Sequence, residues 1–252
     1  MTQANPPVPP VLVLGGTGRT GSRVVSQMLD RGVPVRAIVR SSARLPAEAI
    51  GNPLLTVVEA DLLALSPDQL QAHLEGCDAV ISCLGHTISA RGILGPPRDL
   101  VERAVRNVRG AATALHPASP VRLILMSSVS VNQPGHADAR RGRAERASLS
   151  ALRGVVPPAR DNQRAADFLA RELGASDPSL TWVVVRPDTL TEGDLAEYTV
   201  HDQLVASLAR PDSTRMAQVA EFMCELALDG STWQRWQGQM PVIVDAQPAP
   251  KR

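Results

Sequence analysis

The sequence predicts an α/β fold in which a doubly wound, mostly parallel sheet carries helices on both faces. Short apolar runs alternate along the chain with longer segments that repeat apolar residues at helical spacing. The first apolar run leads directly into a glycine-rich turn, and a helical pattern follows that turn at once. Strands that alternate with helices in this way are typical of βαβ units, which build parallel sheets.

Length and composition favour one domain. Of the 252 residues, 44% are hydrophobic and 20% are charged, which is ordinary for a globular chain that buries a large core. We expect the domain to cover residues 11–245, between a flexible N-terminal tail at 1–10 and a C-terminal tail at 246–252.

Charge and cysteine usage exclude several kinds of partner. The formal net charge of +1 offers no cluster of cations for nucleic acid or for a membrane surface, so we expect neither. The chain begins without a cationic segment followed by an apolar run, and it holds no stretch of about 18 apolar residues, so we expect a cytoplasmic protein. Three cysteines without metal-ligand spacing predict reduced thiols and no metal site; they are Cys77, Cys83 and Cys224.

In the first half of the chain, apolar runs predict strands at Val11–Leu14, Val35–Val39, Leu55–Glu59, 79–84 and Val121–Met126. Helical periodicity predicts helices at 18–31 and 98–115. A third, short helix is expected over Pro67–Leu74, because Ser66 is a good N-cap and proline suits the first helical position.

In the second half, the apolar pattern breaks down between 132 and 160 into glycine, proline and arginine, including the run Arg140-Arg141-Gly142-Arg143. We interpret this segment as a long mobile loop of the kind that often covers a site. Beyond it, the pattern predicts helices at 162–173 and 215–228 and strands at 181–185 and 241–244.

The glycine-rich turn Gly15-Gly16-Thr17-Gly18-Arg19-Thr20-Gly21 lies between the first strand and the first helix, the context of a dinucleotide-binding, Rossmann-type turn. Gly15 would permit the tight turn, Gly18 would let the backbone approach a pyrophosphate, and Gly21 would let the helix pack closely on the strand. The alternative is that the glycines only form a strand-to-helix turn. We predict cofactor contacts at Gly15, Thr17, Gly18, Arg19, Thr20 and Gly21.

The end of the second strand favours NADP(H) over NAD(H). An NAD-binding protein places Asp or Glu about 20 residues after the turn, and this chain has Arg40 there. Arg40 and Ser41, with Arg44 as a further candidate, would offer a planar cation and a hydroxyl to a 2′-phosphate. Arg19 could stack on the adenine or reach the same phosphate. The alternative is that Arg40 is a solvated residue at a strand end.

From Val11 to about Val244 the chain resembles the atypical short-chain dehydrogenases/reductases, specifically their NAD(P)H-binding, NmrA-like branch. The resemblance rests on GGTGRTG, AIVR, the pair Asp61-Leu62, VISCLG, LMSSVS and VVVRPDTL. It implies a single NAD(P)-binding domain. It also implies Asp61 and Leu62 beside the adenine, Cys83, Leu84 and Gly85 beside the ribose and pyrophosphate, and Ser127 and Ser128 facing the nicotinamide. For Asp61 a helix N-cap is the alternative.

The sequence departs from this family at the usual tyrosine and lysine. Tyr198 is the only tyrosine and is followed four residues later by Asp202, while the only lysine is Lys251 in the tail. Gln163 or Arg164 aligns near the usual lysine, and we include Gln163 among the cofactor-binding candidates. As substitutes, His86 could donate a proton near neutral pH and Ser128 could donate a hydrogen bond, although each residue type is more often structural.

These observations leave two functions open. The first is an NADP(H)-dependent oxidoreductase that acts on a small carbonyl, quinone or flavin-like acceptor. The second is a nonenzymatic NADP(H)-binding redox sensor or regulator that acts through a protein partner, which the loss of the tyrosine and lysine favours. A structural protein with an empty fold is disfavoured, because the phosphate turn and Arg40 are both present.

Overall fold

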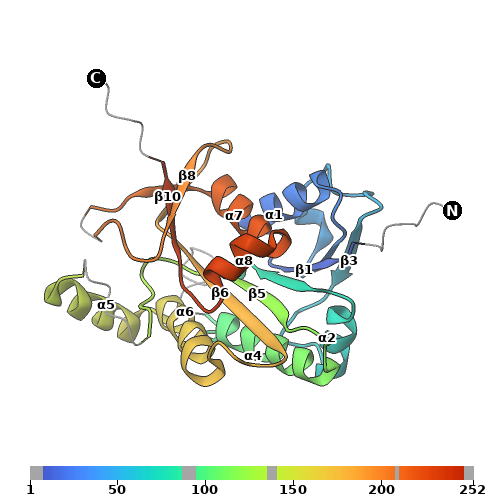
Figure 1. The fold of residues 1–252 in the computed structure, drawn as a ribbon, viewed down its shortest axis with the longest axis horizontal. Helices are drawn as coiled ribbons and strands as arrows, with labels where there is room; N and C mark the ends of the chain where they lie inside the picture. Colours follow the sequence, from blue (N-terminus) through green and yellow to red (C-terminus); the bar gives the residue numbers. More distant parts are fainter. Residues whose placement is uncertain (1–7, 87–94, 135–140, 208–209, 247–252) are drawn as a thin grey trace.

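The computed structural model describes residues 8–86, 95–134, 141–207 and 210–246. The main sheet has the strand order β3-β2-β1-β4-β5-β6-β10-β8, and several of its strands are labelled in Figure 1. Two further short strands, β7 and β9, pair in parallel. Only β8, which pairs with β10, runs antiparallel in the main sheet. The predicted doubly wound, mostly parallel Rossmann-type sheet is therefore confirmed.

The strands are β1 Val11–Leu14, β2 Val35–Val39, β3 Leu55–Glu59, β4 Ala79–Ser82, β5 Val121–Met126, β6 Leu180–Pro187, β7 Thr189–Thr191, β8 Tyr198–His201, β9 Ser213–Arg215 and β10 Val242–Asp245. The helices are α1 Arg19–Asp30, α2 Pro67–Leu74, α4 Leu100–Leu115, α5 Arg143–Val155, α6 Pro157–Asp167, α7 Met216–Leu228 and α8 Gly230–Trp236. A short 3-10 turn, Ser42–Arg44, follows β2, and a π-helical segment, Phe168–Leu173, continues α6.

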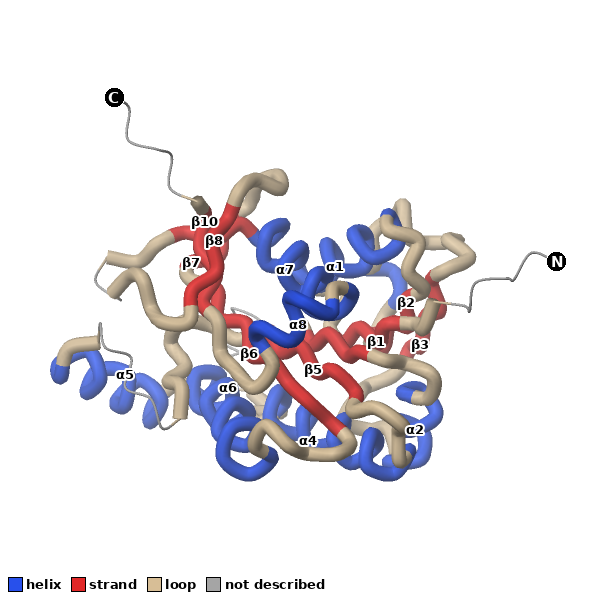
Figure 2. Tube along the Cα trace, viewed as in Figure 1, coloured by secondary structure: helices blue, strands red, loops and turns tan. Residues whose placement is uncertain are grey.

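Helices cover both faces of the sheet (Figure 2). Alternate strand residues point to the two layers. In β1, Val13 packs with α1, α7 and α8 on one face, whereas Leu12 and Leu14 pack with α2, α4 and α6 on the other. The direction of connection reverses between β1 and β4, and this is where the carboxyl ends of the strands open a crevice.

The predicted start of α2 is confirmed in detail. The Ser66 hydroxyl accepts a hydrogen bond from the N–H of Gln69 at 3.2 Å, and the Gln69 side chain accepts one from the N–H of Ser66 at 2.9 Å. This reciprocal pair is a capping box, with Pro67 in the first turn. Local sequence therefore determines this helix boundary.

The predicted loop over 132–160 is wrong for most of its length, because α5 and the start of α6 lie within it. Residues 135–140 of that segment lie outside the described residues. Helix α5 buries only Leu149, and its sequence is rich in arginine and contains Gly154, which suggested a loop although its apolar residues recur at helical spacing. Pro157 and Pro158 occupy the first turn of α6, where proline is tolerated, and do not break a helix there.

The sequence also did not predict β7, β8, β9 and α8, which are three to seven residues long. Segments so short span too few periods to carry a pattern. Almost all of the two expected tails lies outside the described residues. Within the described part of the chain, no helix is both long and apolar enough to span a membrane.

Candidate functional site

Two glycines of the turn after β1 are required because a side chain at either position would clash with the protein's own backbone. Gly15 has a φ of +78°, and a Cβ there would lie 2.8 Å from the carbonyl oxygen of Cys83. At Gly21 a Cβ would lie 2.1 Å from the carbonyl oxygen of Gly15. Gly15 therefore permits the tight turn, as predicted, whereas Gly21 lets α1 approach the turn itself more closely than any side chain would allow.

At Gly18, neither the backbone conformation nor a steric clash with the protein requires glycine. Its φ is −78°, which any residue adopts, and a Cβ would meet only the carbonyl oxygen of Gly15, at 3.3 Å. Gly18 is also the N-cap of α1, so no side chain caps the first-turn N–H groups, and that turn holds no acidic residue. An uncapped helix N-terminus beside open space is a site for an anion.

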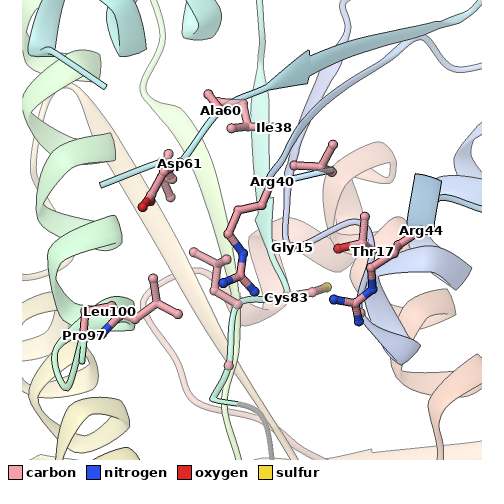
Figure 3. Close-up of a pocket in the computed structure, with 15 residues that line it drawn as sticks. Gly15, Thr17, Ile38, Arg40, Arg44, Ala60, Asp61, Cys83, Pro97 and Leu100 are labelled. Carbon is pink, nitrogen blue, oxygen red and sulfur yellow. The ribbon is translucent and has the colours of Figure 1, made fainter. Parts of the chain in front are cut away.

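A cleft opens beside this turn, where the carboxyl ends of β1, β2, β3 and β4 meet the start of α4 (Figure 3). Nine predicted cofactor residues line it, namely Gly15, Thr17, Gly18, Arg40, Asp61, Leu62, Cys83, Leu84 and Gly85. Its other lining residues are Ile38, Val39, Arg44, Ala60, Pro97 and Leu100. Of these, only Arg44 was a candidate from the sequence. Pro97 and Leu100 reach the cleft through the packing of α4, which local sequence does not reveal.

Two cations point into this cleft. Figure 3 shows the guanidinium of Arg40 in the middle of the cleft and that of Arg44 beside Thr17. Within the described ranges, neither arginine forms an ion pair with a carboxylate. The carboxylate of Glu59, at the end of β3, accepts the N–H of Ser42 at 2.5 Å, and hydrogen bonding by Ser42 lowers the pKa of Glu59. Positive charge thus dominates the end of β2.

Asp61 lies across the cleft from the turn. One of its carboxylate oxygens accepts the N–H of Leu63 at 3.0 Å, which closes a local turn. The helix N-cap alternative for Asp61 does not hold, because residues 61–65 form a turn and α2 begins only at Pro67.

Arg19 lies on the other side of the turn from Arg40. It lines a second groove, together with Arg23, Arg44 and Glu192 among others. The carboxylate of Glu192, which follows β7, lies 2.5 Å from the guanidinium of Arg23 and 3.9 Å from that of Arg19. Arg19 and Glu192 are both about 60% exposed, so this contact is open to solvent and easily displaced.

Seven other candidates from the sequence do not line the cleft, and three of them, His86, Ser127 and Ser128, are described further below. Thr20 and Gly21 are buried in α1, and Ser41 precedes the 3-10 turn. Gln163 on α6 holds the backbone of Asn132 instead, accepting its N–H at 2.8 Å and donating to its carbonyl at 3.1 Å. Its amide group also donates to Asp167, so every polar atom of this side chain has a partner.

At the end of β5, two serines behave differently. The Ser127 hydroxyl is buried and has no hydrogen-bond partner among the described residues. A buried polar atom without a partner is costly, and a bound ligand is one way in which it is satisfied. The Ser128 hydroxyl lies 2.6 Å from that of Ser130.

His86 follows β4 and contacts Asp161 of α6, a residue that the sequence did not single out. The two side chains lie 2.8 Å apart, and they are 6% and 0% exposed respectively. Asp161 also accepts the N–H groups of Val101 and Glu102 in the first turn of α4, each at 2.9 Å. Asp161 and Ala165 share the buried face of α6 at a spacing of four, so recognition of that helix would have placed Asp161 inside.

Tyr198 lies away from the cleft, in a separate groove between β8 and α7. Its ring packs at 6.3 Å from that of Phe222. Burial raises the pKa of Tyr198 above its ordinary value, and a hydrogen bond with Glu225 raises it further. The tyrosine is therefore neither close to the glycine turn nor adapted to release a proton.

The cysteines are free and buried. Burial raises the pKa of the Cys83 thiol, which lines the cleft, to about 12, so it stays protonated near neutral pH and is a poor nucleophile. In the described part of the chain, no group of three or more His, Cys, Asp or Glu side chains could hold a metal ion.

Solved structures share this fold across nearly the whole chain. An oxidoreductase from Lactococcus lactis superposes with a TM-score of 0.67 at 20% identity, covering 95% of this chain and 92% of that one. A short-chain dehydrogenase/reductase from Veillonella parvula, in complex with NADP, gives a TM-score of 0.67 at 13% identity, covering 96% and 95%. At these identities the likeness concerns the fold.

Curated relatives match over shorter stretches. A 3β-hydroxysteroid dehydrogenase/Δ5→4-isomerase from Mycobacterium tuberculosis is 33% identical over 132 residues, which are 50% of this chain and 33% of that protein. An uncharacterised chloroplastic protein from Arabidopsis thaliana is 42% identical over 77 residues, 30% of this chain and 27% of that protein. This chain thus spans about a third or less of the length of either relative.

A family described as NAD(P)H-binding matches residues 15–229, which begin at the first glycine of the turn and end after α7. Because this match covers most of the chain, the protein belongs to the NAD(P)H-binding family, which confirms the NAD(P)H-binding part of the resemblance found in the sequence.

Proposed function

We propose that the protein is an NADP(H)-dependent oxidoreductase that acts on a small carbonyl, quinone or flavin-like acceptor without a tyrosine–lysine pair. The observation that carries this proposal is the pair of cations in the cleft. Arg40 and Arg44 line it at the end of β2, where an NAD-binding protein has an acidic residue. Two guanidinium groups without a carboxylate partner in the described ranges favour a ligand with an additional phosphate.

The residues of the cleft fit this cofactor. Gly18 and the uncapped first turn of α1 would hold the pyrophosphate, and Arg40 and Arg44 would hold the 2′-phosphate. Thr17, Asp61 and Leu62 line the same cleft and would contact the adenosine half, while Cys83, Leu84 and Gly85 would lie along the ribose and pyrophosphate. The buried Ser127 hydroxyl would gain a partner at the nicotinamide end.

When bound, the cofactor supplies the hydride, and the chain has to position the acceptor and stabilise its oxygen. Of the two predicted donors, Ser128 is the better candidate. The His86 side chain is almost wholly buried against Asp161, so we assign it to holding the end of β4 in place. Ser128 is only partly buried, and its hydroxyl can donate a hydrogen bond to an acceptor oxygen.

Turnover is the test of this proposal. Purified protein is mixed with NADPH and a panel of carbonyl, quinone and flavin acceptors while nicotinamide absorbance is followed. We expect acceptor-dependent oxidation of NADPH with at least one acceptor class. Absence of oxidation with every acceptor, alongside tight NADPH binding, contradicts the enzyme and favours the sensor.

Tyr198→Phe should retain most of this activity. The hydroxyl of Tyr198 is bonded to Glu225, lies in a different groove, and has a raised pKa. Loss of that bond should lower stability by about 1 kcal/mol and leave NADPH oxidation near the wild-type rate. Steady-state rates of both proteins across pH provide the measurement, and a collapse of the Tyr198→Phe rate would show that β8 moves toward the cleft.

Glu192→Gln should tighten NADP(H) binding by about two- to fivefold, because it removes a negative charge beside the cations that face the phosphate turn. Calorimetric titration at low and moderate salt measures the effect, which should shrink as salt rises. Glu221→Gln is the matched control, since Glu221 of α7 pairs with Arg31 at the C-cap of α1 and neither residue lines the two grooves beside the turn. Weaker binding in Glu192→Gln would mean that Glu192 helps to orient the arginines.

A nonenzymatic NADP(H)-binding redox sensor is the second candidate, and Gln163 favours it. Gln163 is one of the two residues that align near the usual lysine, and it is neutral, with its amide fully engaged with Asn132 and Asp167. Gln163 therefore supplies no cation to act on the nicotinamide ribose. A sensor would bind NADPH without turnover and would pass the state of the cofactor to a protein partner.

A further inference from the structure

The loop that carries Ser128 is held by three arginines from different parts of the chain. Arg141 donates to the carbonyl oxygen of Val129, Arg153 of α5 donates to that of Ser130 at 2.8 Å, and Arg186 of β6 donates to that of Val131 at 3.3 Å. Three consecutive carbonyl groups therefore receive guanidinium donors. Charged donors form the stronger hydrogen bonds, so the backbone of this loop is firmly fixed.

The same loop places two hydroxyl groups in contact. The oxygens of Ser128 and Ser130 lie 2.6 Å apart, and the N–H of Ser130 donates to the Ser128 oxygen at 3.3 Å. A serine hydroxyl has one proton to donate and two lone pairs that accept. If the Ser130 hydroxyl also donates, both lone pairs of Ser128 are filled, and the proton of Ser128 has to point to another acceptor.

We infer that Ser130 is a positioning residue, which directs the hydroxyl proton of Ser128 toward the oxygen of the substrate. This inference rests on the proposed function, and it assigns the stabilisation of the acceptor oxygen to two serines acting together. Ser128 gives a hydrogen bond and keeps its proton, so no bond is made or broken at either serine, and the proton that the reduced acceptor gains comes from water. In the opposite arrangement Ser128 donates to Ser130 and has no proton left for a substrate.

Arg153 contributes to the positioning of Ser128 because it holds the backbone of Ser130. Helix α5 has only Leu149 buried, and the hydrogen bond of Arg153 connects this helix to the loop after β5. Burial lowers the pKa of Arg153, in keeping with a guanidinium partly removed from solvent. Loss of this side chain should loosen the Ser130 backbone without touching the phosphate turn.

Steady-state kinetics with Ser128→Ala, Ser130→Ala, Ser130→Thr and the double alanine variant test the inference. We expect Ser130→Ala to lower kcat about tenfold, the scale of one hydrogen bond, with the calorimetric Kd for NADPH unchanged. Ser130→Thr, which keeps a hydroxyl, should recover most of the rate. The double variant should be no slower than Ser128→Ala alone, because Ser130 acts through Ser128.

Hydrogen exchange of the cofactor-free protein gives a second readout. Arg153→Ala should speed exchange of the amides in residues 128–132, whereas Arg146→Ala, which removes an exposed arginine from the same helix, should not. Unchanged kcat in Ser130→Ala, additive losses in the double variant, or unchanged exchange in Arg153→Ala would overturn the inference. If wild type binds NADPH but reduces no acceptor, the proposed function itself fails and the role of Ser130 fails with it.

Discussion

Gly18→Ala is expected to weaken NADP(H) binding by about 100-fold or more while the protein stays folded. The backbone at Gly18 is in a conformation that alanine adopts, and the added Cβ would meet only the Gly15 carbonyl oxygen, at 3.3 Å. The methyl group would instead occupy the space through which the pyrophosphate approaches the backbone. Calorimetric titration with NADPH measures the affinity, and thermal unfolding of the free protein shows whether the variant stays folded.

Alanine substitutions at two other glycines serve as comparisons for Gly18→Ala. Gly110→Ala, in the exposed middle of α4 with open space around it, should raise stability by about 0.5–1 kcal/mol and leave binding unchanged. Gly21→Ala should prevent stable folding, because its Cβ would lie 2.1 Å from a backbone oxygen. Wild-type affinity in a folded Gly18→Ala protein would show that the turn does not hold the cofactor.

Asp161→Ala should lower the free energy of unfolding by about 3 kcal/mol. The substitution leaves the buried His86 ring and the N–H groups of Val101 and Glu102 without their acceptor. Asp161→Asn should cost less, because the amide oxygen still accepts. Urea unfolding gives the values.

Asp99→Ala is the matched control for Asp161. Asp99 is the N-cap of α4 but its side chain caps no N–H group; it is about half exposed and lies 3.9 Å from Arg103, so its loss should change stability by less than about 1 kcal/mol. A similarly small effect of Asp161→Ala would mean that water replaces the carboxylate and that α4 and α6 are not tied together through it.

The sequence predicted those parts of the fold that local pattern determines. β1, the glycine turn and α1 follow one another within 20 residues, and their order alone implies the backbone geometry of Gly15. Arg40 was predicted for a related reason, since the end of β2 always lies beside the end of β1 in this topology. The locations of residues that depend only on the strand order could therefore be predicted from the sequence.

The sequence did not predict features that depend on packing between distant segments. The arginines and Gly154 of α5 suggested a loop, and so did Pro157 and Pro158, although these prolines begin α6. Asp161 acquires its role only when α6 brings it to His86 and to the first turn of α4. Gln163 was one of two residues aligned near the usual lysine, yet it holds the Asn132 backbone, a contact that spans 31 residues.

The preference between NADPH and NADH is the most direct test of the proposed cofactor site. Both cofactors are titrated calorimetrically into wild type and Arg40→Ala. The cations in the cleft predict that wild type binds NADPH more tightly than NADH by about 1–3 kcal/mol, and that Arg40→Ala loses most of this preference with little change for NADH. Equal affinities in wild type, or an undiminished preference in Arg40→Ala, would contradict the assignment of Arg40 to a 2′-phosphate.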